Sequence, residues 1–299
     1  MDSFASMIDL GFLAALLRIA TPLLLATMGE LYAERSGVLN LGIEGTMLLG
    51  AMTGFTAAYF TGNLWLGVAA ALATGALVGL LMALLTVVLG VSQHVSGIGT
   101  TLLATGLAFF FYRMIFGQPA IPPNVVPFQP VLLGQTALTW IAVAAVPATW
   151  LALHRTRWGL NLRTVGENPR AADTAGVSVW SMRIQALVIS GALMGVGGAY
   201  LTLAQFNAFT FGVISGRGWV CIALVVFGQW MPWRCAAGVL LFAMIEALQL
   251  RLQAHNVLNI PYEIFLMLPF VMTILAMALV SRNAHAPAAL LIPFRKEER

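Results

Sequence analysis

The sequence predicts an all-α, polytopic integral membrane protein. Of the 299 residues, 60% are hydrophobic and only 9% are charged, whereas a soluble domain carries charges on about a quarter of its residues. The second observation is a series of apolar runs that reach about 20 residues, the length a helix needs to cross a bilayer. Strands of a membrane barrel would alternate in polarity over about ten residues, so these run lengths exclude a β-barrel.

Nine apolar runs are candidate crossings, which predicts about 8–10 transmembrane helices. They cover residues 10–33, 37–60, 64–90, 95–116, 136–153, 184–206, 210–230, 233–252 and 261–281. The runs 37–60, 95–116 and 210–230 are rich in glycine or threonine and are polar at one end. We therefore expect some of these three to be broken or re-entrant segments rather than simple spans.

The positions of the arginines predict the topology. The hydrophilic connection 154–183 holds five arginines against Glu167 and Asp173, and the tail 283–299 is also basic. Cytoplasmic loops carry an excess of Lys and Arg, so both segments are predicted to be cytoplasmic, and the net charge of +4 indicates topology rather than nucleic-acid binding. Residues 1–282 then form one transmembrane domain. Five crossings precede the loop, which predicts an N-terminus on the outside.

Missing motifs exclude several kinds of chemistry. A phosphate-binding loop needs Gly-x4-Gly-Lys-Ser/Thr, but the single lysine, Lys296, stands in FRKEER. The chain is therefore not expected to be an ATP-hydrolysing enzyme. Its four histidines and two cysteines lack metal-ligand spacing, so no metal or other cofactor is expected. A Gly-x-Ser-x-Gly nucleophile motif is also absent.

One local motif in the basic loop, ENPRAADTAG, predicts a short isolated helix. Asn168 can cap its start, Pro169 suits the first helical position, and Gly176 can end it in a left-handed conformation. A capped helix of this kind either only orders the loop or serves as a docking point for a soluble partner.

The most informative polar pair stands in ERSGVLNLGIEGTMLLGA, where Asn40 and Glu44 lie four residues apart on one helical face. Ionisable groups inside apolar segments normally face the bundle interior or a water-filled path, and Arg217 and Glu246 belong to the same class. Two roles stay open for Asn40 and Glu44. They either contact a substrate or hydrogen-bond a neighbouring broken helix and hold its shape.

An internal similarity links this stretch to a later one. Residues 36–50 and 215–228 both begin Ser-Gly-x, continue as an apolar run and end in glycine. The predicted topology runs them in opposite directions, and opposed repeats that meet at the midplane are a known transporter arrangement. The sequence therefore predicts an inverted internal repeat, with Arg217 and Trp219 as the counterparts of Asn40 and Glu44.

Three stretches resemble the membrane permeases of bacterial ABC importers that serve branched-chain amino acids, simple sugars and nucleosides. They are ERSGVLNLGIEGTMLLGA, RTVGENPRAADTAGVSV followed by ISGALMGVGGAYL, and GRGWVCIALVVFGQWMPW. The start GVLNLGIEG together with GRGW and ALVVFGQWMP resembles the nucleoside branch, and within it the shorter of two paired permeases.

The resemblance implies a multi-pass protein of the bacterial inner (plasma) membrane with several partners. These are a second, homologous permease, a cytoplasmic ATPase with two ATP-binding cassettes, and a periplasmic or lipid-anchored substrate-binding protein. ATP hydrolysis then takes place on the separate ATPase. It also implies that this ATPase docks on the short cytoplasmic helix, through Gly166, Glu167, Asn168, Pro169, Ala172, Asp173 and Gly176.

The predicted function is that of a permease subunit for nucleosides or related purine and pyrimidine compounds. The predicted substrate path holds Asn40, Glu44, Phe109, Arg217 and Trp219, and Phe109 and Phe206 are candidates to stack on a base. One alternative substrate is a simple sugar or riboflavin. Another alternative is a proton-coupled secondary transporter that works alone, with Glu44 and His94 as its proton relay.

Overall fold

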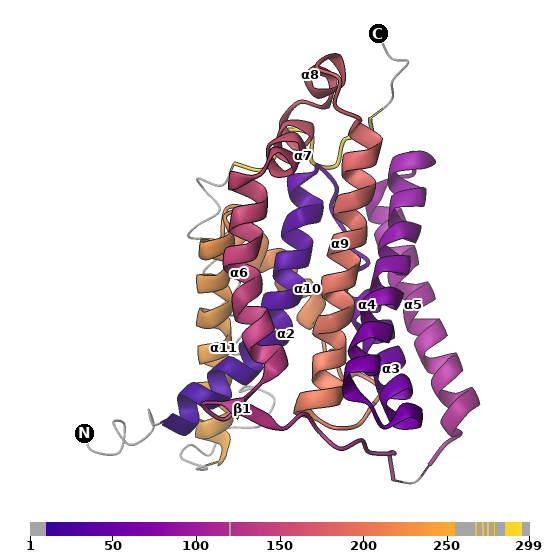
Figure 1. Ribbon diagram of the computed structural model, residues 1–299, viewed down its shortest axis with the longest axis vertical. Helices are drawn as coiled ribbons and strands as arrows, with labels where there is room; N and C mark the ends of the chain where they lie inside the picture. Colours follow the sequence, from indigo (N-terminus) through magenta and orange to yellow (C-terminus); the bar gives the residue numbers. More distant parts are fainter. Residues whose placement is uncertain are drawn as a thin grey trace.

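The computed structural model describes residues 10–119, 121–254 and 285–294, together with the single positions 267, 271, 274 and 278 (Figure 1). The described part of the chain is predominantly helical, which confirms the predicted all-α class. Its only strands are β1 (Pro130–Leu132) and β2 (Gln135–Thr136), which pair as a short antiparallel hairpin. β1 lies near one end of the long axis and the short helix α8 (Pro169–Thr174) at the other, and these ends are called the β1 end and the α8 end below.

Six of the described helical segments are long and apolar enough to cross a bilayer. They are α2 (Leu10–Arg35), α4 (Leu64–Ala83) extended by the π-helical turn η1 (Leu84–Val88), α5 (Gln93–Phe116), α6 (Ala137–Arg155), α9 (Val179–Tyr200) extended by η2 (Leu201–Gln205), and α11 (Pro232–Ala254). Of the three runs among which we expected some broken segments, 95–116 is not broken, because α5 is continuous. The ninth run, 261–281, lies outside the described residues except for four single positions.

Two of the expected broken segments have that character. The run 37–60 begins with irregular backbone and becomes helical only in α3 (Ile43–Thr61). In the run 210–230 only α10 (Arg217–Phe227) is helical. Its 11 residues extend about 16 Å at 1.5 Å per residue, roughly half of the hydrocarbon core. The candidate crossing at 210–230 is therefore one of the expected broken segments, and it contains a half-length helix.

The central helices α2 and α9 pack against each other, and α9 also contacts α3 and α4. Glycines let the backbones approach closely along this seam, as small residues do in membranes. A Cβ atom added to Gly75 of α4 would lie only 2.1 Å from the carbonyl oxygen of Gly191 in α9. Similarly, a Cβ at Gly50 of α3 would lie 2.5 Å from the Cα of Gly195. The packed core therefore depends on the absence of side chains at these crossings.

The helices α3, of 19 residues, and α10, of 11 residues, point in opposite directions, as the predicted topology requires of these two segments. The inverted internal repeat itself stays a prediction. α2 runs toward the α8 end, residues 36–42 turn back, and α3 continues toward the β1 end, where it meets the start of α4 through Gly54 and Gly67. α10 starts beside Glu44, at the beginning of α3, and its following turn reaches Glu34 and Arg35 at the α8 end. The two helices thus start near one point and diverge.

The basic loop and the described part of the C-terminal tail lie at the same end of the molecule. The loop forms α7 (Arg157–Glu167) and α8 beyond the ends of α2, α6 and α9. The backbone N–H of Ala289 donates to the carbonyl oxygen of Gly166 at 2.9 Å. The Arg183 guanidinium donates to the carbonyl oxygen of Ile292 at 3.2 Å. Leu10, the first described residue, lies at the opposite end.

Candidate functional site

The carboxylate of Glu44 holds the start of α10. Its Oε1 accepts a hydrogen bond from the backbone N–H of Gly216, and its Oε2 accepts one from Gly218, both at 2.8 Å. The first N–H groups of a helix have no partner within the helix, and the helix dipole favours negative charge there. A Cβ at position 218 would lie 2.7 Å from Oε2, so Gly218 allows this close approach. Glu44 therefore joins the starts of α3 and α10.

Asn40 shapes the irregular segment that leads into α3. Its side-chain Oδ1 accepts from the backbone N–H of Gly42 at 3.0 Å, and its own backbone N–H donates to Oε1 of Glu30 at 3.0 Å. The residue is buried. The described contacts of Asn40 and Glu44 are thus with backbone groups and neighbouring side chains, as the supporting role requires. Their contact with a substrate stays a prediction.

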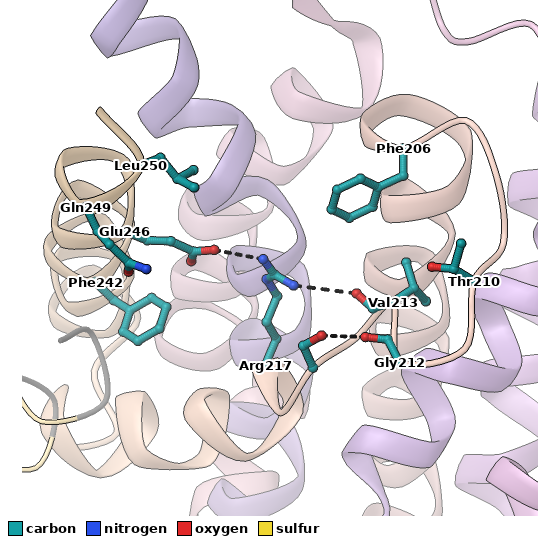
Figure 2. Close-up of a pocket in the computed structure, with 10 residues that line it drawn as sticks. Phe206, Thr210, Gly212, Val213, Arg217, Phe242, Glu246, Gln249 and Leu250 are labelled. Carbon is teal, nitrogen blue, oxygen red and sulfur yellow. Dashed lines mark hydrogen bonds and ion pairs between the residues drawn. The ribbon is translucent and has the colours of Figure 1, made fainter. Parts of the chain in front are cut away.

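An ion pair marks a pocket of about 370 Å³ between α11 and the segment 206–215 (Figure 2). Nη2 of Arg217 donates to Oε1 of Glu246 at 2.7 Å, and the two side chains are 16% and 17% exposed. Nη1 of Arg217 lies 3.3 Å from the carbonyl oxygen of Ile214 and 3.5 Å from that of Val213. The opposite charges of the pair balance each other, so neither charge stands alone in a low-dielectric setting.

The rest of the pocket wall combines two phenylalanines and one buried amide with Thr210, Gly212, Val213, Ser215 and Leu250. Figure 2 shows Phe206 and Phe242 on opposite sides of the ion pair, with Gln249 one turn beyond Glu246 on α11. Phe206 is half-exposed, whereas Phe242 and Gln249 are buried. Sequence reasoning singled out Arg217, Glu246 and Phe206 but missed Phe242 and Gln249. Both stand inside a long apolar helix. Only their spacing from Glu246, about one helical turn in each direction, could have suggested that they share a face with it.

The structure separates two other predicted path residues from this pocket. Phe109 lines a second groove with Phe110, Arg113, Met114 and Phe211. Its ring stands edge-on to that of Phe211, with 4.8 Å between the ring centroids. Trp219 is 43% exposed on α10 and does not line the Arg217 pocket. Of the five predicted path residues, Glu44, Arg217 and Trp219 therefore meet at the start of α10, where the backbone of Trp219 also contacts the Glu44 carboxylate.

The predicted capped helix is present at the α8 end. Oδ1 of Asn168 accepts from the backbone N–H of Ala171 at 3.0 Å, Pro169 occupies the first helical position, and Gly176 has a φ of +84°. Ala172 is buried against Val165 and Val179, which fixes α8 on its neighbours. Most other residues of the turn, among them Asn168, Arg170 and Ala171, are exposed.

The remaining predicted docking residues connect α8 to the membrane helices and to the tail. Gly166 is buried, and a Cβ there would lie 2.1 Å from the carbonyl oxygen of Arg35 at the end of α2. Oε2 of Glu167 accepts from the backbone N–H of Ala288 at 3.3 Å. Asp173 belongs to a shallow pocket beside Ser178, Trp180 and Phe294. The seven predicted docking residues therefore form one continuous segment, exposed on α8 and anchored at Gly166.

Comparison with known proteins gives the same picture along almost the whole chain. A model of the branched-chain amino acid transport system permease component matches residues 12–277. A putative glucose ABC transporter permease, TsgC13 of Haloferax volcanii, is 42% identical over 82% of this chain and 78% of that protein. The guanosine ABC transporter permease NupQ of Bacillus subtilis is 34% identical over 95% of this chain and 96% of its own length.

A third relative, the nucleoside ABC transporter permease NupC of Lactococcus lactis, is 33% identical over 92% of this chain and 94% of that protein. No solved structure matches the chain. The matched range includes the opposed helices α3 and α10, the Arg217 pocket and the capped helix α8. The chain belongs to the family of branched-chain amino acid transport system permease components, the membrane subunits of ABC transporters.

Proposed function

We propose that this chain is one of two permease subunits of an ATP-driven importer that carries nucleosides across the bacterial inner membrane. The observation that carries the proposal is the match to permeases for guanosine and for nucleosides over more than nine-tenths of the chain. The Arg217 pocket supports it, because it combines aromatic walls with a few polar groups, as pockets for small organic solutes do.

The short helix α10 supplies the element that changes between states. α10 is held at its start by Glu44 and at its end by the contacts of Trp230 with Glu34 and Arg35. A short helix held at both ends moves as a unit when either attachment moves. In this proposal the path runs past Asn40, Glu44 and Arg217, with Phe109 and Trp219 on the face that a partner covers.

The ATPase with its two cassettes docks on α8 in this proposal. α8 projects at the end that carries the basic loop, and the positive-inside rule places this end in the cytoplasm. Gly166 anchors the segment against the backbone of Arg35, and Arg35 in turn binds Trp230. Movement of the cassettes therefore reaches the turn after α10 through a short chain of contacts.

The second permease covers the face formed by residues 206–219. Irregular backbone at membrane depth is tolerated only where protein buries it or where it lines a water-filled cavity. Thr210, Gly212 and Ser215 in this segment are exposed in the single chain. A homologous permease would cover part of this face and leave the rest as the path. The substrate-binding protein then delivers solute at the β1 end, opposite the ATPase.

Reconstitution tests the proposal directly. The chain is placed in proteoliposomes with the permease, ATPase and binding protein encoded beside it, and uptake of radiolabelled guanosine is measured with ATP and with a non-hydrolysable analogue. Uptake that requires hydrolysable ATP and all components is the expected result. Uptake by this chain alone that follows a pH gradient would overturn the proposal in favour of a secondary transporter.

The structure gives the proton-relay alternative little support. His94 is exposed in the first turn of α5. α5 meets the start of α3 through Thr101, about two helical turns further along.

A second candidate substrate is favoured by a specific observation, the 42% identity to a putative glucose permease. Radiolabelled glucose in the same proteoliposomes separates the two substrates.

A further inference from the structure

We propose that the pocket at the Arg217–Glu246 ion pair binds an uncharged nucleoside, and that Gln249 determines which solute the pocket accepts. This inference rests on the proposed function and goes one step beyond it. It assigns a binding site and a specificity residue, and it predicts which charged relatives of a nucleoside are refused.

The two charges that line the pocket, on Arg217 and Glu246, balance each other. Arg217 directs its guanidinium at Glu246 and at the carbonyl oxygens of Val213 and Ile214. A nucleotide brings a phosphate that needs an uncommitted cation, and an amino acid brings an ammonium and a carboxylate that each need a counter-charge. Binding either one here requires breaking the ion pair and leaving a partly buried charge unpaired, which is costly. The pocket therefore suits an uncharged solute.

Gln249 places a polar amide in the wall of the pocket. Its side chain is 3% exposed and lines the pocket, and it forms no hydrogen bond with any residue that the structure describes. A buried amide without partners costs free energy unless a ligand or water satisfies it. A glutamine amide offers donors and an acceptor side by side, the pattern that pairs with the edge of a nucleobase. A sugar hydroxyl satisfies only part of that pattern.

Two phenylalanine rings also line the pocket. Phe206 lies at the end of η2 and Phe242 on α11, on the two sides of the pocket (Figure 2). Both rings are apolar and neither carries a hydrogen-bonding group, but Phe206 is half-exposed whereas Phe242 is buried. Stacking of a base on an aromatic side chain contributes about 1–3 kcal/mol. Two phenylalanine rings, an amide that has no hydrogen-bond partner among the described residues and a balanced ion pair together favour a nucleoside over glucose.

A cysteine protection experiment tests this site in the assembled transporter. The two native cysteines, Cys221 and Cys235, are fully buried, so Ser215→Cys places an accessible thiol at the pocket rim. The rate of its modification by a polar thiol reagent is measured in proteoliposomes with increasing guanosine. Guanosine is expected to slow the reaction, whereas guanosine 5′-monophosphate, leucine and glucose at equal concentration leave it unchanged. Thr210→Cys, on the same rim, replaces Ser215→Cys if that variant does not assemble.

Gln249→Leu is then added to the cysteine variant, with Gln253→Leu as the matched control one turn further along α11 and outside the pocket lining. Losing a buried hydrogen-bonding partner should raise the guanosine concentration for half-protection about tenfold or more, and Gln253→Leu should not. The inference fails, with the proposed function intact, if ATP-driven guanosine uptake is observed but guanosine does not protect the cysteine, or if Gln249→Leu changes nothing. Equal protection by glucose also overturns it. Absence of ATP-driven guanosine uptake by the unmodified transporter instead contradicts the proposed function itself.

Discussion

The guanidinium group of Arg35 donates two hydrogen bonds to the carbonyl oxygen of Trp230, at 2.9 Å from Nε and 2.7 Å from Nη2. The indole Nε1 of Trp230 donates to Oε2 of Glu34 at 2.5 Å. These contacts hold the turn between α10 and α11 in place. In this turn Gln229 and Trp230 adopt positive φ values, 50° and 55° respectively. Such backbone is unfavourable for residues other than glycine and persists where the surroundings hold it.

Replacing Arg35 should uncouple the two halves of the transport cycle. Arg35→Met removes both hydrogen bonds to Trp230, each worth about 1.5–3 kcal/mol for a charged donor, and frees the turn after α10 from the docking end. We expect guanosine uptake to fall much more than ATP hydrolysis in the reconstituted transporter. Arg18→Met is the matched control, because Arg18 is an exposed arginine of the same helix. Equal loss in both variants, or full uptake in Arg35→Met, would refute the coupling role.

Glu44→Gln should weaken the attachment of α10. A neutral amide cannot accept from both Gly216 and Gly218, because one of its two positions carries N–H groups. The expected loss is about 1–3 kcal/mol of stability, seen as a lower unfolding temperature and lower guanosine uptake. Glu167→Gln, at an exposed carboxylate that accepts a single backbone N–H, should leave the unfolding temperature unchanged.

Asn40→Ala separates support from substrate contact. It removes the acceptor for the Gly42 N–H, so the supporting role predicts loss of thermal stability with an unchanged guanosine concentration for half-maximal uptake. A change in that concentration at unchanged stability would assign Asn40 to the substrate. Wild-type values in both Asn40→Ala and Glu44→Gln would exclude the pair from the path and from its support.

Removing the cap of α8 should weaken docking without unfolding the membrane helices. Asn168→Ala loses the side-chain acceptor for the Ala171 N–H, at a cost of about 1 kcal/mol, while Asn168→Ser keeps an acceptor. We expect less ATPase to co-purify with Asn168→Ala and wild-type amounts with Asn168→Ser. Normal ATP-driven uptake in Asn168→Ala and in Pro169→Gly would argue against docking on α8.

The close contact between Gly75 of α4 and Gly191 of α9 predicts that an added methyl group lowers stability. Gly75→Ala places a Cβ 2.1 Å from the carbonyl oxygen of Gly191, so the helices must separate, at a cost of about 1–3 kcal/mol or more. Gly106→Ala lies in α5 with nothing within 4 Å of the added atom. It should be neutral or stabilising by up to about 1 kcal/mol, from helix propensity. The unfolding temperature in detergent compares the two, and equal values would show that the seam tolerates a methyl group.

Local signals predicted the parts of the structure that depend on a few neighbouring residues. The cap at Asn168, the proline at 169 and the left-handed Gly176 act over one helical turn, so their chemistry is visible in ENPRAADTAG alone. The opposite directions of the segments that start at 36 and 215 were also predicted, from their paired Ser-Gly starts and the arginine positions. Which of the glycine- and threonine-rich runs are broken was not predicted, because an apolar run shows that a segment can lie in lipid, not that it is helical throughout. Backbone at 206–216 stays irregular against α11 and Glu44.

The sequence by itself determined that this is a helical membrane protein, where its polar residues interrupt the apolar runs, and which short helix projects from the basic loop. Only the tertiary structure decided that Glu44 binds the start of α10, that Arg35 binds Trp230, and that Gln249 faces the pocket of Arg217. These pairs are separated by 32 to 195 residues. Their meeting depends on how whole helices pack, because a residue type states which bonds it can form but not which distant partner the fold brings to it.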